Sequence, residues 1–91
     1  MLKGKTTSGF SFSIEDEARD DMELLENITK FDAGEKQLVS EILVGLLGQK
    51  QKDKLYDYCR GKTGRVSATK VFEELHSIFE VIQNSEDDVK N

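Results

Sequence analysis

The sequence contains no proline, no tryptophan and only one cysteine among its 91 residues. A single cysteine cannot form an internal disulfide, and no charged-then-apolar signal sequence precedes the first apolar segment, so we expect a reducing, cytoplasmic compartment. The longest apolar stretch, Ile42 to Leu47, is far shorter than the roughly 20 residues that a membrane-spanning helix needs. We therefore expect a protein with no disulfide framework and no membrane partner.

Residues suited to catalysis are equally scarce. Cys59 is the one cysteine and His76 the one histidine, and nothing in the sequence places them side by side. We expect Cys59 to be a small apolar residue on the inner face of a helix and His76 to be a partly exposed structural residue. Without an acid, base and nucleophile set, the sequence predicts no catalytic residues and no enzyme activity.

Two segments resemble a metal-binding or a phosphate-binding motif, but neither contains all the residues that its motif requires. The acidic run from Asp16 to Asp20 resembles the start of an EF-hand calcium loop, but Asp21 stands where that loop needs glycine and Asn27 where it needs glutamate. The segment Gly61-Lys62-Thr63-Gly64 shares only its composition with a phosphate-binding loop, whose two glycines are further apart. We predict no metal site and no cofactor.

The charge balance is acidic, with a net charge of −5 and a pI near 4.8. Such a protein repels the phosphate backbone of nucleic acids unless a basic face is segregated. A basic run extends from Lys50 to Arg65, but Asp53 and Asp57 interrupt it. We expect no nucleic-acid partner, while a small DNA-binding regulator with its third or fourth helix in the major groove stays open as an alternative.

What the sequence does contain is an alternating segment near its start. Residues 10–14 alternate phenylalanine or isoleucine with serine, the period of two that is typical of a half-buried strand. Residues 1–6 and 10–14 flank Thr7-Ser8-Gly9, whose glycine can adopt the positive φ of a tight turn. The pattern predicts an N-terminal β-hairpin whose apolar face packs on helices or on a neighbouring subunit.

Helical periodicity follows from Met22 onward. The expected helices cover about 16 or 20 to 31, 35 to 47, 49 to 60, and 68 to 82 or 83. The predicted fold class is therefore α+β: an N-terminal β-hairpin followed by a bundle of about four helices, mainly α. One domain is expected over 1–83, with the hairpin at about 1–14 and the helices at about 16–83, before a mobile acidic tail at 84–91.

The first, second and last of the predicted helices each carry an apolar stripe that we expect to be buried. The first stripe consists of Met22, Leu24, Leu25, Ile28 and Phe31. The second and strongest consists of Leu38, Val39, Ile42, Leu43, Leu46 and Leu47. The last consists of Ala68, Val71, Phe72, Leu75, Phe79 and Ile82, with Ile78 at its margin. We expect Leu43 and Phe72 to share one core.

Three small residues have expected roles within these helices. Gly45 predicts the close approach of a neighbouring element, because glycine otherwise only weakens a helix. Gly48 is placed as a C-terminal cap, and Ser67 as the N-cap of the last helix.

The hairpin is the expected binding surface, because the free edges of a two-stranded sheet invite pairing with another chain. The carboxylates that begin the first helix are a second candidate, since a solvated acidic face can recognise a basic partner. The candidate partner-binding residues are Phe10, Ser11, Phe12, Ser13, Asp20, Asp21 and Tyr56. The free edges also predict weak self-association.

Taken in order, several segments resemble one protein family. They are Lys3-Gly4-Lys5-Thr6, Ser8-Gly9-Phe10-Ser11-Phe12-Ser13-Ile14, Asp20-Asp21-Met22-Glu23-Leu24-Leu25-Glu26, Leu46-Leu47-Gly48, Gln51-Lys52-Asp53-Lys54-Leu55-Tyr56 and Gly64-Arg65-Val66. Their order and spacing are similar to those of the small tail assembly chaperones of long-tailed, siphovirus-type bacteriophages and prophages of Gram-positive hosts. Family members often carry an aromatic residue at the position of Met22 and a proline at the position of Ser67, so the chain departs from the pattern there.

This resemblance implies a non-enzymatic factor of virion morphogenesis that works in the host cytoplasm. Its implied partners are the tape measure protein, which such chaperones are thought to coat, and the tail tube protein. Such chaperones often have a second, longer product made by ribosomal frameshifting, so the resemblance implies that possibility here.

An acidic helical carrier or adaptor is a further alternative. An acyl carrier, however, needs an aspartate before its modified serine, and Ser67 follows Val66.

Overall fold

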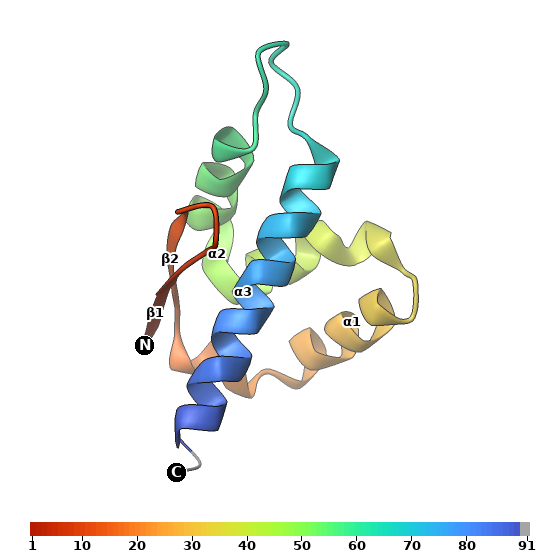
Figure 1. Cartoon of the computed structure of the whole chain (residues 1–91). Coiled ribbons are helices and arrows are strands. Elements are labelled where there is room, and N and C mark those ends of the chain that lie inside the picture. Colours follow the sequence, from red (N-terminus) through yellow and green to blue (C-terminus); the bar gives the residue numbers. More distant parts are fainter. Residues whose placement is uncertain (90–91) are drawn as a thin grey trace.

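The N-terminal hairpin forms as predicted. In the computed structural model, which describes residues 1–89 and the side chains of residues 1–85, β1 (Leu2–Lys5) pairs antiparallel with β2 (Ser11–Ile14), and Gly4 lies opposite Phe12 (Figure 1). The backbone N–H of Thr6 donates to the Phe10 carbonyl at 2.9 Å, and Gly9 has a φ of 106°. Glycine therefore supplies the positive φ that closes the turn.

Three α-helices follow the hairpin, together with two short 3₁₀ turns. The helices are α1 (Met22–Asp32), α2 (Val39–Tyr58) and α3 (Ala68–Val89), and the turns are η1 (Asp16–Asp20) and η2 (Lys36–Leu38). The α+β class is confirmed, but the prediction of about four helices was wrong. The expected second and third helices form one bent element, because Gly48, at φ 80° and ψ 163°, turns the chain without an intervening loop.

The last helix is longer than the sequence pattern indicated. Its expected end was at Ile82 or Gln83, yet α3 continues to Val89. The apolar stripe ends near Ile82, but the segment contains no glycine or proline to stop the helix. The expected mobility of the tail stays a prediction, and residues 90–91 lie outside the described residues.

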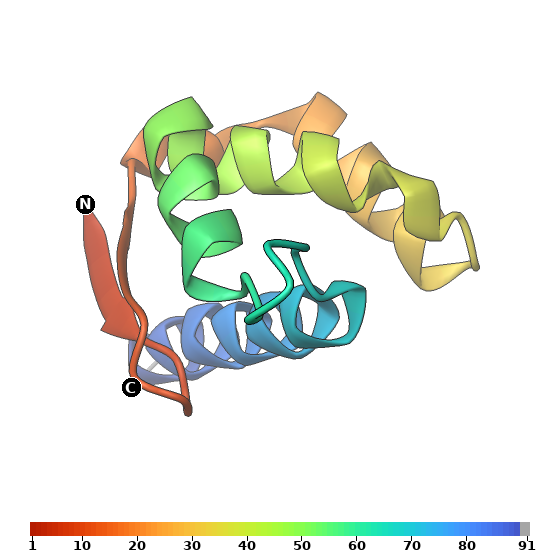
Figure 2. The same ribbon diagram turned by 90° about the horizontal axis from the view of Figure 1, so that it is seen from above.

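The hairpin lies against two helices, with β1 on α3 and β2 on α2 (Figures 1 and 2). Gly4 allows this close packing, because a Cβ atom there would lie 2.7 Å from Val81 Cγ1. Below 3.0 Å a side chain would have to shift. The requirement for glycine in β1 thus follows from how near the strand approaches α3.

A single core joins the hairpin to α2 and α3. Its most fully buried members are Ile14, Ile42, Leu43, Leu55, Leu75, Ile78 and Cys59. The predicted centre of the core in α2 is confirmed, and so are the burial of the hairpin face and of Cys59. Leu24 from α1 joins this core at Gly45, where a Cβ atom would lie 2.9 Å from Leu24 Cδ1. The expected close approach at Gly45 is therefore present.

Two of the expected buried stripes were wrong in part. In α1, Leu24 and Phe31 are buried, but Met22 and Leu25 are 65% and 54% exposed. In α3, Phe72 is 36% exposed rather than buried beside Leu43, and Ile78, which was expected at the margin of the stripe, is fully buried. The apolar stripe of each helix is wider than the surface that its neighbours cover, which are α2 and η2 for α1, and α2 and β1 for α3.

A buried carboxylate fixes the hairpin turn to α3. Glu74 is only 7% exposed, and its Oε1 and Oε2 each accept a hydrogen bond of 2.7 Å, from Thr6 Oγ1 and from Ser8 Oγ. One turn further along α3, the Ser77 hydroxyl accepts from the backbone N–H of Thr7 at 2.9 Å. Both charged oxygens are satisfied, so this buried acid holds the turn in place.

Candidate functional site: an apolar groove between α1 and α3

The described residues form an apolar groove between α1 and α3. Both helices pack against α2, and between them lie two adjoining hollows that share Phe79 as a common wall. Leu46 of α2 lies on the floor of one hollow. The groove exists because the apolar stripes of α1 and α3 are wider than the surface that α2 can cover.

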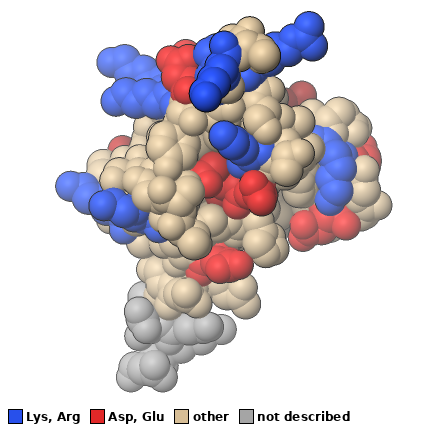
Figure 3. All heavy atoms as spheres, turned by 45° about the horizontal axis from the view of Figure 1, so that its top comes forward, with Lys and Arg blue, Asp and Glu red and all other residues tan. Residues whose placement is uncertain are grey.

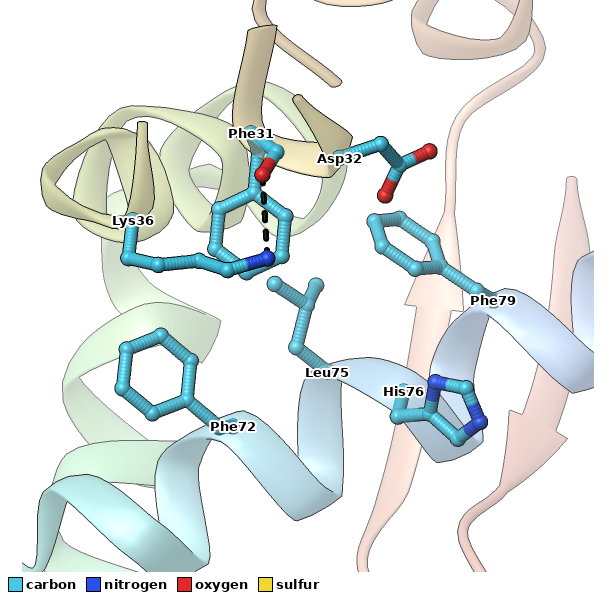
Figure 4. A pocket seen from close by; sticks show the side chains of 7 residues that line it. All are labelled: Phe31, Asp32, Lys36, Phe72, Leu75, His76 and Phe79. Carbon is cyan, nitrogen blue, oxygen red and sulfur yellow. Dashed lines mark hydrogen bonds between the residues drawn. The ribbon is translucent and has the colours of Figure 1, made fainter. Parts of the chain in front are cut away.

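The first hollow is aromatic and has a volume of about 310 Å³. Figure 4 shows Phe31 of α1 facing Phe72 and Phe79 of α3, with Leu75 between them. The rings of Phe31 and Phe72 have centroids 5.9 Å apart. This end of the groove is suited to an apolar side chain, since aromatic rings give large contact areas at low entropy cost.

The second hollow is larger, at about 380 Å³, and lies toward the N-terminal end of α1. Its apolar lining comes from α1, α2, α3 and the end of η1. These residues are Ala18, Leu24, Leu25, Ile28, Leu46, Phe79 and Ile82. The exposed side chain of Leu25 stands at this wall, so the groove offers apolar surface directly to solvent.

Charged groups lie at the two ends of the groove rather than along it. At the aromatic end, the Lys36 ammonium is 4.2 Å from the centroid of the Phe31 ring and donates to the Phe31 carbonyl at 3.0 Å (Figure 4). Figure 4 shows Asp32 and His76 on the other side of this hollow, near Phe79. At the other end lie Arg19 and Asp21. An apolar segment with polar residues at both ends matches this arrangement.

Three of the four predicted hairpin residues, Phe10, Phe12 and Ser13, have structural roles. Phe10 and Phe12 are buried in the core, at 8% and 4% exposure, whereas Ser11 is exposed. Ser13 is bonded through its backbone, which donates to Gln51 Oε1 at 2.8 Å and accepts from Gln51 Nε2 at 2.8 Å. The Gln51 amide thus occupies the outer edge of β2 as a paired strand would, and the remaining free edge of the hairpin is that of β1.

The other predicted residues are dispersed over the surface. Asp21 is the N-cap of α1, since its Oδ1 accepts from the backbone N–H of Leu24 at 3.1 Å, and it also borders the groove. Asp20 is exposed at the end of η1. Tyr56 lies under the Lys52 ammonium, which is 4.8 Å from its ring centroid. As partner-binding residues these positions remain predictions.

Sequence reasoning missed Leu25, Phe72 and Phe79 as surface residues because their spacing matches a buried stripe. One feature of the sequence could have indicated this exposed surface. The segments that form α1 and α3 carry more apolar residues than a narrow contact with a neighbouring helix can bury. The sequence does not tell which of them stay open, since that depends on the crossing angle of each helix on α2.

Ser67, Cys59 and His76 are the remaining residues for which the sequence predicted a role. The expected N-cap at Ser67 is present, with its hydroxyl accepting from the Lys70 N–H at 3.2 Å. Cys59 is buried, and that burial, with a smaller contribution from Glu74, raises the pKa of its thiol. His76 is exposed and lies 3.4 Å from Glu80. Within residues 1–85 no three histidine, cysteine or carboxylate side chains are grouped to hold a metal ion.

Comparison with protein-family models, with curated proteins and with solved structures found no match to this chain. Within the described part of the chain, no helix is both long and apolar enough to span a membrane.

Proposed function

We propose that the chain is a non-enzymatic tail assembly chaperone of a long-tailed bacteriophage, and that its groove between α1 and α3 binds an amphipathic helical segment of the tape measure protein in the host cytoplasm. The observation that carries the binding role is the groove itself, where Leu25 and Phe72 are 54% and 36% exposed although the core beneath is closely packed. The phage identity rests on the resemblance of the N-terminal and α2 segments to that family.

The dimensions of the groove support a helical client. Its α1 wall, Met22–Asp32, contains 11 residues and is about 16 Å long at 1.5 Å per residue. Three turns of a client helix would lie along it and place apolar residues in both hollows, as in other helix-in-groove complexes. A tape measure protein is long and helical, so it offers apolar stripes that would aggregate if left uncovered.

A shallow groove also suits a client that must later be released. It buries few apolar residues of the client, so each contact is weak, and retention comes from many chaperone copies on one long chain. Release then needs only local displacement as tail tube subunits assemble.

The DNA-binding alternative has less support. Three of the basic residues on which it rested, Arg60, Lys62 and Arg65, lie in the loop between α2 and α3 rather than along a helix that could enter the major groove. The carrier alternative is not favoured either, because Ser67 serves as the N-cap of α3.

Co-expression with the tape measure protein of the same phage tests the proposal. We expect that protein to be insoluble when expressed alone and soluble, in a complex, with this chain. The double variant Leu25→Ser/Phe72→Ser should lose most of the complex in a pull-down, because it removes apolar side chains from both hollows.

The matched control is Val44→Ser. Val44 is also exposed, at 37%, but it lies on α2 and lines neither hollow. It should bind as the parent does. Equal binding by the parent and the groove variant would place the contact elsewhere, and an insoluble client with the parent would end the chaperone proposal.

A further inference from the structure

The two edges of the hairpin differ in what covers them. The Gln51 amide donates to the Ser13 carbonyl and accepts from the Ser13 backbone N–H, both at 2.8 Å, so the outer edge of β2 is occupied there. Figure 2 shows β1 at the margin of the molecule, with β2 between it and α2. A further strand therefore finds its unobstructed edge at β1.

The hydrogen-bond register shows which groups of β1 face away from β2. The Thr6 N–H donates to the Phe10 carbonyl at 2.9 Å, so these residues form a hydrogen-bonded pair. Bonded and non-bonded pairs alternate in an antiparallel ladder, so the backbone N–H and C=O groups of Lys3 and Lys5 point away from β2. Ser13, the partner of Lys3, likewise turns both of its groups away from β1. No other described residue is hydrogen-bonded to the backbone of Lys3 or Lys5.

The side chains of these two residues make the outer face of β1 positively charged. Lys3 and Lys5 are exposed and alternate with the partly buried Leu2 and Gly4. Residues 1–14 contain no carboxylate that could neutralise the lysines. Figure 3 shows lysine and arginine side chains projecting on the side where the hairpin lies, at the left of the view. The edge of β1 thus combines free backbone groups with positive charge.

We propose that the edge of β1 binds an extended segment of a partner protein as a third strand of the sheet, with acidic residues of that segment opposite Lys3 and Lys5. Main-chain hydrogen bonds supply the affinity and alternate side chains the specificity, as in other cases of strand addition. Cross-strand pairs of opposite charge stabilise the added strand. The inference is independent of the proposed function, since β1 lines neither hollow of the groove.

A second copy of β1 is not the partner that this edge favours. Side chains on one face of a sheet lie opposite side chains of the same face, so two paired β1 strands would set lysine against lysine. Lysine on an edge strand is a common protection against such self-pairing. The two lysines therefore disfavour a second β1 strand and favour a strand of opposite charge.

The neighbouring surface of α3 restricts the other face of the added strand. Beyond the end of β1, the backbone N–H of Thr7 donates to the Ser77 hydroxyl at 2.9 Å. Beside this contact, Thr7, Ser77, Glu73 and Glu80 line a hollow of about 300 Å³. Acidic residues that faced this hollow would be repelled. We therefore expect acidic residues only at alternate positions of the bound segment, with neutral residues between them.

An NMR titration of the ¹⁵N-labelled whole chain with synthetic peptides tests the proposal. The probe is a short peptide of alternating threonine and glutamate, and we expect the largest amide shift changes at Lys3 and Lys5. A peptide with lysine in place of glutamate should bind about tenfold more weakly, because it meets like charges.

A second pair of peptides tests whether the backbone takes part. The probe is N-methylated either on its glutamates or on its threonines, which leaves its charge unchanged. One of these peptides should bind about tenfold more weakly and the other as the probe does, because a strand turns only alternate N–H groups toward its neighbour.

The variant Lys3→Glu/Lys5→Glu should reverse the preference, so that the lysine peptide binds more tightly than the glutamate peptide. The matched control Lys50→Glu/Lys54→Glu makes the same change in net charge on exposed residues of α2. It should bind as the parent does, and both variants should keep the circular dichroism of the parent.

The proposal is overturned if the glutamate peptide leaves the amides of Lys3 and Lys5 unshifted, if the two N-methylated peptides bind alike, or if the control is as impaired as the hairpin variant. It is also overturned if a short DNA duplex shifts the same amides more strongly than the peptide does, since the lysines would then serve a nucleic acid.

Discussion

The two sides of the α2 helix differ in how completely they are covered. On one side the hairpin and α3 close the core, so that Ile14, Leu55 and Ile78 are at or near zero exposure and Glu74 fixes the turn through two hydroxyl hydrogen bonds. On the other side α1 contributes only Leu24 and Phe31 to the core, and Leu25 remains 54% exposed.

This difference assigns stability to one side of α2 and binding to the other. The closed side uses its apolar residues for stability, and the polar network specifies where the hairpin sits. The open side retains apolar surface that adds little to stability, which is typical of a surface kept for a partner. Substitutions on the two sides should therefore separate into those that unfold the protein and those that change only what it binds.

The largest effect is expected in the closed core. Leu43 is fully buried, so Leu43→Ala should lower the free energy of unfolding by about 2 to 5 kcal/mol through lost burial and a residual cavity. Phe72→Ala, at a residue that is 36% exposed, should cost clearly less. Urea denaturation followed by circular dichroism gives both values, and equal losses would erase the distinction between the two sides.

A smaller effect is expected at the hairpin anchor. Glu74→Gln replaces a carboxylate oxygen that accepts a hydroxyl hydrogen bond with an NH₂ group, so we expect a loss of about 1 to 3 kcal/mol. Amide hydrogen exchange should speed up most in 6–10, the turn that Glu74 holds. Unchanged exchange in the turn would mean that the apolar face of β2 alone fixes the hairpin.

The smallest effect on stability is expected at the groove. Leu25→Ser removes an exposed side chain, so the free energy of unfolding should change by only about 0.5 kcal/mol, while binding of the tape measure protein should fall. Thermal melting of the parent and the variant provides the comparison. A melting temperature lowered as much as by Leu43→Ala would show that Leu25 belongs to the core.

Sequence patterns predicted the closed side well and the open side poorly. The alternation of residues 10–14 fixes which hairpin face is buried, because a strand has only two faces. The paired apolar residues of α2 likewise identified Leu43 as a core residue. In α1 and α3, however, periodicity defines an apolar face but not what covers it, so Leu25 and Phe72 were assigned to the core.

Two other features could not be predicted in full from the sequence. The bond between Glu74 and the turn joins residues that are 68 and 66 positions apart, Thr6 and Ser8, and no local pattern indicates such a pair. Gly48 was expected to end a helix, and its positive φ fits that role. The local sequence does not encode whether the chain then forms a loop or bends directly into another helical segment, as it does within α2.

The most direct test of the groove as the binding site is an NMR titration of the ¹⁵N-labelled protein with a soluble helical fragment of the tape measure protein. We expect the amide shift changes to cluster at the groove, around Leu25, Ile28, Phe31, Phe72 and Phe79, with little change in β1 and β2. Shift changes confined to the hairpin, or the absence of binding at millimolar concentration, would contradict the account.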